Sequence, residues 1–291
     1  MRTVALVLLG LLGCGDDVSG NGGSSGAGGR AGSGGAGGIG GGGAGGGIGG
    51  AGGIGGGGGT GGTGGAGATI CPPLAAPSGT IVRVAPAQAN DLPAMVASAS
   101  AGTTLLLDDG TYRMTTSGEA ARRIHFAVPG VTLRSASGNA AAVVLDGEYL
   151  TDEMMFVDAS DVTIAEVTLM RVVHHLVHVT APDGGPDVSG VRLLGLRLVD
   201  AGQQFVKVNE NAARTFWVDG GRVECSFFLL TDAGRPHVDM TSTPCYTGGI
   251  DTHSGRGWVV RRNRFETIYC PSGLAEHAIH FWTGSRDTLV E

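Results

Sequence analysis

The sequence predicts an all-β solenoid that follows a long flexible segment, and three observations support this fold class. Short segments rich in Val, Leu and Ile recur about every 30 residues from residue 130 onward. Gly, Asp, Asn and Ser separate these segments, as turns between strands require. The 56 glycines of the 291-residue chain are unevenly spread, with 32 of them in residues 20–67. Only the remainder of the chain can therefore bury a core.

The N-terminus has the features of a secretory signal. Arg2 precedes an apolar run over residues 4–12, which is too short to span a bilayer. The run ends in Leu11-Leu12-Gly13-Cys14, which resembles the bacterial lipobox, where cleavage precedes a cysteine that becomes lipidated. We expect residues 1–13 to be a lipoprotein signal peptide and Cys14 to anchor the protein in the bacterial cell envelope, at the outer membrane or cell surface. An ordinary signal peptide with a nearby cleavage site is the alternative.

Residues 14–68 are predicted to form a flexible linker. Their glycines lack the Gly-X-Y period of collagen, and they lack the strand and helix context of a phosphate-binding loop. A Gly-rich chain over residues 20–67 has an expected end-to-end distance of roughly 35–42 Å. The linker would hold the domain away from a membrane without fixing its orientation.

The charge of the chain bears on its partners. The net charge is -7, and residues 1–68 contribute nothing to it, because two arginines there balance two aspartates. Nucleic acid is therefore not an expected partner. The densest basic cluster is Arg261, Arg262 and Arg264, and alternation along a strand would place its members on different faces. We expect the domain, residues 69–291, to be a monomer.

One helix is expected near the start of the domain, over residues 91–100, where Asp91 offers an N-cap and Pro93 suits a first turn. The residues after it are predicted to form short strands. Each repeating unit holds three strands, as in residues 162–164, 167–169 and 177–179. The strands that open successive units begin near Gly130, Asp161, Gly190, Val223, Val259 and Leu289.

This pattern resembles the right-handed parallel β-helix family, which includes pectate-lyase-like and chondroitinase-like proteins. The resemblance covers residues 80–291 and rests on residues 102–112, which are similar to the family's first coil, and on the later rungs. It implies that the N-terminal helix caps the core. A β-sandwich is the rival architecture, but the regular repeat argues against it. Residues 286–291 look like the opening strand of another rung without a cap, so we expect a C-terminally incomplete solenoid.

One strand of each rung can be aligned by its inward apolar residues, and the alignment predicts two outward columns. The aligned inward pairs are Ile124/Phe126, Met155/Val157, Val177/Val179, Val206/Val208, Ile250/Thr252 and Ile279/Phe281. The first outward column is His125, Phe156, His178, Lys207, Asp251 and His280. The second is Ala127, Asp158, Thr180, Asn209, His253 and Trp282. Rungs stack about 4.8 Å apart, so neighbours in a column would be in contact.

The later half of this face collects groups that can do chemistry. In β-helix polysaccharide lyases, the resemblance implies, a lysine or arginine removes the proton next to a uronate carboxylate while a cation or a neutral acid offsets the developing charge. Lys207, the only lysine of the chain, has the residue type of that base. His253 and His280 are candidate acids, because histidine titrates near neutral pH. The predicted substrate-binding residues are His178, Asn209, Asp251 and Trp282, the last as a platform for a sugar ring.

The expected function is thus binding of an acidic polysaccharide, with cleavage by β-elimination. Asp251 beside Lys207 would hold the lysine protonated, which is the wrong state for a base. The two residues could instead form a cross-rung ion pair on a non-catalytic adhesin or glycan-binding protein. Glycoside hydrolysis needs two carboxylates about 5–10 Å apart, whereas Asp158 and Asp251 would lie two or more rungs apart.

No metal site is predicted. The string Trp217-Val218-Asp219-Gly220 matches the Trp-Ile-Asp-His of the pectate lyases only loosely, and no three acidic ligands are evident, so calcium is left open. Glu276, His277 and His280 superficially suggest a zinc site, but His277 and His280 would point to opposite faces of a strand.

Four cysteines remain besides Cys14, and an exported domain permits them to form disulfides. Cys245 and Cys270 each precede an aligned strand, in the same loop of adjacent rungs, so they form the preferred pair. Cys71 and Cys225 would then pair only by elimination.

Overall fold

The computed structural model describes residues 71–241, 245–273 and 277–291. The signal peptide, Cys14 and the linker to residue 68 lie outside these ranges, so they stay predictions. All described residues belong to one compact unit. None of the helices in the described ranges has the length and apolarity of a membrane-spanning helix.

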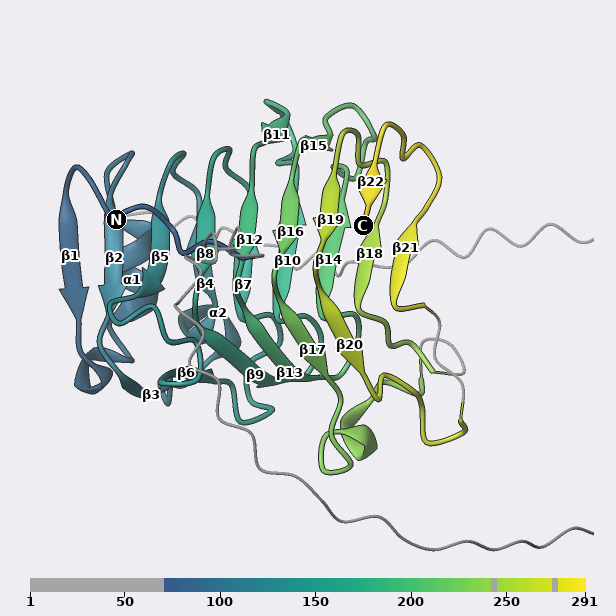
Figure 1. The fold of residues 1–291 in the computed structure, drawn as a ribbon, viewed down its shortest axis with the longest axis horizontal. Coiled ribbons are helices and arrows are strands. Elements are labelled where there is room, and N and C mark those ends of the chain that lie inside the picture. Colours follow the sequence, from purple (N-terminus) through teal and green to yellow (C-terminus); the bar gives the residue numbers. More distant parts are fainter. Residues whose placement is uncertain (1–70, 242–244, 274–276) are drawn as a thin grey trace, which may run out of the picture. The chain divides into compact units, whose positions relative to one another are not determined.

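The unit is a parallel β-helix, which confirms the predicted fold (Figure 1). Every strand pair is parallel, and each full rung adds one strand to each of three stacked sheets. Sheet A consists of β1 (Ile81–Val84), β2 (Thr104–Leu107), β5 (Thr132–Ser135), β8 (Thr163–Ala165), β12 (Arg192–Leu194), β16 (Arg222–Glu224), β19 (Val259–Arg261) and β22 (Leu289–Val290). All six predicted opening strands lie in this sheet.

The other two large sheets hold six strands each. Sheet B consists of β3 (Gly110–Arg113), β6 (Val143–Asp146), β9 (Thr168–Val172), β13 (Arg197–Ala201), β17 (Phe227–Leu229) and β20 (Arg264–Glu266). Sheet C consists of β4 (Ile124–Phe126), β7 (Met155–Val157), β10 (Val177–Thr180), β14 (Val206–Asn209), β18 (Ile250–Thr252) and β21 (Ile279–Phe281). A small sheet of β11 (Val188–Ser189) and β15 (Val218–Asp219) lies in the connections from sheet C to sheet A.

The turn from sheet A to sheet B is two residues long in four successive rungs. Its first residue adopts a left-handed conformation each time, with φ near 57° at Glu166, 59° at Gly195, 56° at Cys225 and 56° at Arg262. Only glycine adopts this conformation without a steric penalty, so three of the four residues are held there by the pairing on either side. This tight, repeated turn keeps successive rungs in register.

The core is a stack of inward apolar side chains. The inward residues that the sequence aligned are in-register neighbours on adjacent strands of sheet C. Val177 pairs with Val206, for example, and Ile250 pairs with Ile279. Phe228, which is fully buried, lies between Phe205 and Phe265, at ring-centroid distances of 6.0 and 4.5 Å. Because side chains alternate, inward packing of one residue fixes its neighbours outward.

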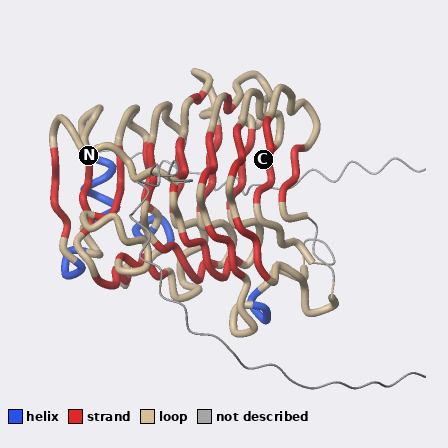
Figure 2. The backbone as a smooth tube through the Cα atoms, viewed as in Figure 1, coloured by secondary structure: helices blue, strands red, loops and turns tan. Residues whose placement is uncertain are grey.

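The helical elements are short and lie beside the rungs (Figure 2). They are η1 (Pro86–Gln88), α1 (Leu92–Ala97), α2 (Glu119–Arg122) and η2 (Arg235–His237). The predicted N-terminal helix is α1, which buries Leu92 and Val96 and packs against β4, as a cap of sheet C would. Asp91 is its N-cap residue but makes no side-chain capping bond. The other three elements were not predicted.

Two disulfides join distant segments. Cys71 is bonded to Cys225 in the turn between β16 and β17, across 154 residues and with 5.9 Å between the Cα atoms. Cys245 is bonded to Cys270, with 5.8 Å between the Cα atoms. Arg134 Nη1 donates to the Ala75 carbonyl at 2.6 Å, so the segment after Cys71 is also held against sheet A.

Replacing Phe228 by Ala should test the packing of the core. We expect a loss of about 3–5 kcal/mol in the free energy of unfolding, because the change removes a buried ring and leaves a cavity. Leu150, which is 56% exposed, provides the control, and Leu150→Ala should change stability by less than about 0.5 kcal/mol. Chemical denaturation measures both values, and equal losses would contradict this description of the core.

Candidate functional site

Sheet C carries the predicted first outward column on successive strands. The pairing register places its six members opposite one another in the order His125, Phe156, His178, Lys207, Asp251 and His280. The residues of the second column lie at the ends of the same strands, with Thr180 and Asn209 paired inside the ladder. The main-chain bonds His253 N to Val208 O and Trp282 N to Thr252 O, both 2.8 Å, extend the ladder to two of them.

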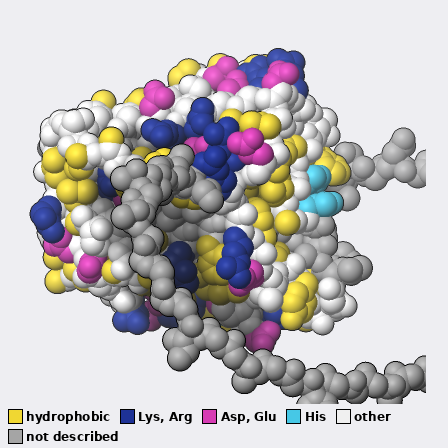
Figure 3. Space-filling view, viewed as in Figure 1, with side chains coloured by type: hydrophobic (Ala, Val, Ile, Leu, Met, Phe, Trp, Pro, Cys, Tyr) yellow, Lys and Arg dark blue, Asp and Glu magenta, His cyan; other side chains and the backbone are white. Residues whose placement is uncertain are grey.

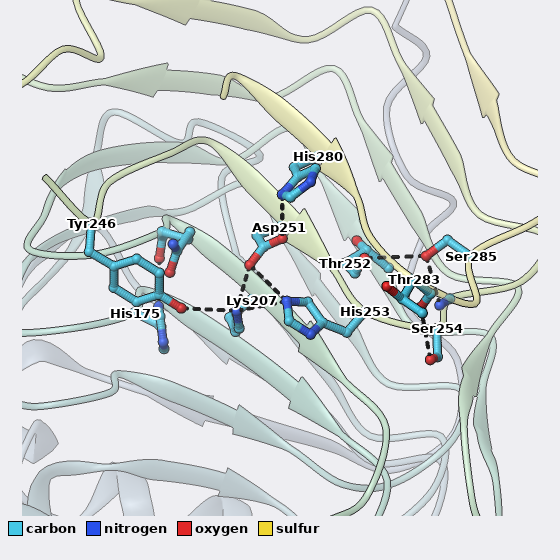
Figure 4. Close-up of polar contacts among 12 residues, drawn as sticks. His175, Lys207, Tyr246, Asp251, Thr252, His253, Ser254, His280, Thr283 and Ser285 are labelled. Carbon is cyan, nitrogen blue, oxygen red and sulfur yellow. Dashed lines mark hydrogen bonds and ion pairs between the residues drawn. The ribbon is translucent and has the colours of Figure 1, made fainter. Parts of the chain in front are cut away.

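Lys207 is the centre of a polar cluster on this face (Figure 4). Its Nζ lies 2.5 Å from Asp251 Oδ2, 3.2 Å from Tyr246 Oη and 3.3 Å from His253 Nε2. An ammonium group has three hydrogens, so Lys207 can donate to all three of these neighbours. The Lys207 and Asp251 side chains are only 7% and 8% exposed, so the ion pair is buried.

Asp251 lies between the lysine and two histidines. His253 Nε2 is 3.3 Å from Asp251 Oδ2, and His280 Nδ1 is 3.2 Å from Asp251 Oδ1. Both are ion-pair distances. The His280 contact lacks hydrogen-bond geometry, since Oδ1 is buried and has no hydrogen-bond partner. One carboxylate therefore serves Lys207 through one oxygen and faces His280 with the other.

The electrostatics keep this pair charged. Burial favours neutral Asp251, but hydrogen bonding from His253 and the charge of Lys207 outweigh it and hold the pKa of Asp251 well below its usual range. Burial likewise lowers the pKa of Lys207, and the charge of Asp251 more than offsets this, so the pKa is raised. Lys207 is thus a protonated, fully engaged cation at neutral pH, which does not suit a general base.

Exposed groups surround the buried pair. Trp282 is 53% exposed, and its ring lies 4.7 Å from that of His280 and 6.3 Å from that of His253. Asn209 lies two rungs from Trp282 in the second column, and its Oδ1 is buried without a hydrogen-bond partner. The exposed ring of Trp282 is the surface of this face on which a sugar ring can stack.

The N-terminal half of the face has a second polar group. His178 Nδ1 lies 2.6 Å from Glu153 Oε1, and Arg123 Nη1 lies 3.5 Å from Glu153 Oε2. Burial would raise the pKa of Glu153, but the hydrogen bond and charge of His178, with the nearby charge of Arg123, lower it to about 2. Burial lowers the pKa of His175 to about 3, so this histidine is neutral.

The structure places all seven residues predicted to act in catalysis or binding on the outward face of sheet C. Lys207, Asp251, His253, His280 and Trp282 form one cluster, whereas His178 contacts Glu153 and the Asn209 amide oxygen has no partner. Sequence reasoning missed Tyr246, Glu153 and Arg123, which come from loops without a repeat. The expectation that His277 and His280 point to opposite faces was wrong. Their rings stack at 4.3 Å, because β21 begins only at Ile279 and His277 precedes it. In the described ranges, no three His, Cys, Asp or Glu side chains are grouped to hold a metal ion.

Comparisons with known proteins find a similar arrangement at low similarity. Pectate lyase Pel9A matches at 14% identity and a TM-score of 0.43, over 64% of this chain and 47% of that chain. Alginate lyase from Paenibacillus sp. str. FPU-7 matches at 13% identity and a TM-score of 0.45, over 72% and 76%. A mannuronic acid specific polysaccharide family 6 lyase from human gut microbiota matches at 10% identity and a TM-score of 0.22, over 73% of this chain and 82% of that chain.

The match spans about half the length of pectate lyase Pel9A. No protein-family model and no curated protein matches the chain. Likeness at this level carries no inference about activity, so function has to be argued from the residues of sheet C.

Glu153 should make stability depend on pH in acid. Its folded pKa lies below the unfolded value of 4.5, so its contribution to stability is present above about pH 4.5 and is lost as the pH falls toward 2. Glu153→Gln should remove this loss and flatten the unfolding free energy over that range. Asp232, whose side chain is 95% exposed, gives the control Asp232→Asn. If Glu153→Gln and wild type gave parallel pH profiles, the assignment would be wrong.

Proposed function

We propose that the outward face of sheet C binds an acidic polysaccharide and cleaves it by β-elimination. The observation that carries this proposal is the cluster in which buried Asp251 lies between Lys207 and His280, next to the exposed ring of Trp282. The arrangement provides an imidazole beside a fixed carboxylate, a hydroxyl group beside a fixed cation, and a platform for a sugar.

The charges of the face favour an anionic polymer. Its three carboxylates, Glu153, Asp158 and Asp251, all have basic partners at ion-pair distance. The negative charge of each carboxylate is thus balanced within the face, so these carboxylates do not leave a net negative charge that would repel an anionic polymer.

The hydrogen-bond pattern assigns a role to each polar group. His253 Nε2 lies 3.3 Å from both Lys207 Nζ and Asp251 Oδ2, so a neutral His253 accepts from the lysine when its hydrogen is on Nδ1 and donates to the carboxylate when its hydrogen is on Nε2. In the first of these forms His253 serves as a neutral donor to a substrate oxygen. His280 turns Nδ1 toward Asp251 and has Nε2 available as a base. Tyr246 accepts a hydrogen bond from Lys207 and keeps its own hydroxyl proton to donate.

In the proposed reaction, His280 Nε2 takes the proton from the sugar carbon next to the carboxylate. The electron pair of that C–H bond forms a carbon–carbon double bond, and the bond to the leaving sugar oxygen breaks. The leaving oxygen takes the hydroxyl proton of Tyr246. Lys207, 3.2 Å from Tyr246 Oη, offsets the phenolate charge that forms. Lys207 is then a positioning residue and not the base that the sequence suggested.

Simple glycan recognition is the second candidate. The observation that favours it is the burial and full engagement of Lys207 and Asp251, which is also what a structural cross-rung ion pair would show. In that case Trp282 and Asn209 would bind a sugar and no bond would break. A variant that separates binding from turnover decides between the two.

The catalytic proposal predicts that His280→Gln lowers the rate at least about 100-fold while keeping polymer binding. The rate is the increase in ultraviolet absorbance from unsaturated uronate ends, screened over polygalacturonate, alginate and glucuronan. His125→Gln, on the same face but away from the cluster, is the matched control and should stay within about threefold of wild type. Trp282→Ala should weaken binding instead. If the protein bound a polymer saturably but released no product from any of them, the catalytic proposal would be wrong and glycan recognition would be the function.

The location of the protein is part of the proposal. The lipobox-like string ending at Cys14 and the two disulfides, which are typical of exported proteins, support a lipid-anchored protein of the bacterial cell envelope.

Cys14→Ser tests this location. In a bacterial host, wild type should fractionate with membranes and incorporate labelled palmitate, and the variant should lose the label. A variant of Cys71, which lies in a disulfide and not at the lipobox, should keep it. Equal labelling of wild type and Cys14→Ser would rule out the anchor.

A further inference from the structure

A second cluster lies on sheet B, outside the site described above. Arg197, Phe227 and Arg264 occupy the same outward position on three consecutive strands, β13, β17 and β20. The guanidinium carbon of Arg197 lies 5.3 Å from the centre of the Phe227 ring, and that of Arg264 lies 5.6 Å from it. The ring therefore holds two arginines in a fixed order along the solenoid.

These arginines differ from other basic groups of the domain. Basic and acidic side chains lie side by side over much of the face in Figure 3, and an acidic partner neutralises most arginines. Arg197 has no acidic side chain at ion-pair distance in the part of the chain that the structure describes. Arg264 contacts Glu266, but its side chain is 75% exposed. The cluster thus keeps net positive charge on an acidic domain.

An apolar column runs beside the basic one. Val199 and Leu229 pair in register on β13 and β17, two residues after Arg197 and Phe227, and Glu266 follows them in the same column on β20. The surface at this cluster is hollowed, and the hollow is lined by Arg197, Cys225, Ser226, Phe227, Arg262, Arg264 and one acidic residue, Glu266. A basic column next to an apolar column matches a sugar polymer, whose rings have apolar C–H faces and whose substituents carry the charge.

We propose that this sheet B cluster is a second, non-catalytic binding site for an anionic polysaccharide. Arg197 and Arg264 lie two rungs apart, about 10 Å, and each presents a planar fork that binds a carboxylate or sulfate through two hydrogen bonds. Stacking on Phe227 removes part of the entropy cost of fixing them. The inference rests on the proposed function only for the class of polymer.

The cluster would act by raising the local concentration of polymer. Sheets B and C are different faces of each rung, so a chain on sheet B leaves the Lys207 cluster open. A long polymer, or two chains of a network, can then occupy both faces, and the second contact becomes intramolecular. Short oligosaccharides gain nothing from it.

Nucleic acid is also a polyanion, but the cluster does not suit it. Single strands bind by stacking bases on exposed aromatic faces. Arginines lie over the Phe227 ring on both sides, which leaves no open face for a base. The net charge of -7 further opposes a phosphate backbone.

The test uses the double variant Arg197→Gln/Arg264→Gln. Its affinity for immobilised polygalacturonate and dextran sulfate should fall at least about tenfold, while its rate on short uronate oligosaccharides stays as in wild type. The matched control is Arg83→Gln/Arg222→Gln, which removes the same charge from two sheet A arginines that are each paired with an acid. This control should bind as wild type does. Circular dichroism verifies that both fold.

Further arms give each outcome a meaning. Arg197→Lys/Arg264→Lys keeps the charge but loses the fork, and should bind with intermediate affinity. Equal loss in both Gln doubles would reduce the effect to net charge and overturn the site. The site would also be overturned if Trp282→Ala abolished all polymer binding. It would be overturned as well if single-stranded DNA bound more tightly than either polymer and that binding depended on the cluster. If no unsaturated product formed while the sheet B cluster still bound polymer, the proposed cleavage would be refuted and the sheet B site would stand.

Discussion

The in-register parallel pairing of successive rungs is the constraint on which the rest of this protein depends. Four successive rungs repeat the same short A-to-B turn, and the inward apolar residues stack. Because a shift of one residue would exchange the inside and outside of a strand, burial of the core also fixes what faces outward. Residues that are far apart in sequence thereby become neighbours. Lys207 and Asp251 are separated by 44 positions and still pair directly.

The buried Lys207–Asp251 pair shapes what sheet C can do. Removing both charges from water is costly, and the contacts to Tyr246 and His253 offset part of that cost. The charge of Asp251 keeps the lysine protonated, so the chemistry passes to the groups around it. The two arrangements are complementary. The fixed cation favours loss of a proton by the phenol beside it, and the fixed carboxylate favours uptake of a proton by the imidazole beside it.

Much of this arrangement follows from the sequence, because it depends on period and alternation. The repeat near 30 residues and the inward Val and Ile of each unit were enough to predict both columns of sheet C. Tyr246 and Glu153 escaped prediction, because they lie in loops where no period places them. His277 was misplaced for the same reason, since the strand begins two residues later. The arginine cluster of sheet B also escaped prediction. The sequence shows Arg264 only beside Arg261 and Arg262, whereas the arginine that shares its column is Arg197, two rungs away.

The three-sided coil also separates its tasks among faces. Sheet C is bordered by the turns to sheets A and B, whereas the turn from A to B lies at the remaining corner. Cys225 occupies that corner, and Cys71 is bonded to it. The segment after Cys71 runs against sheet A, where Arg134 holds it. The described N-terminal segment is thus fastened to the one corner that does not border sheet C. A polymer lying along the Lys207 cluster does not have to displace that segment.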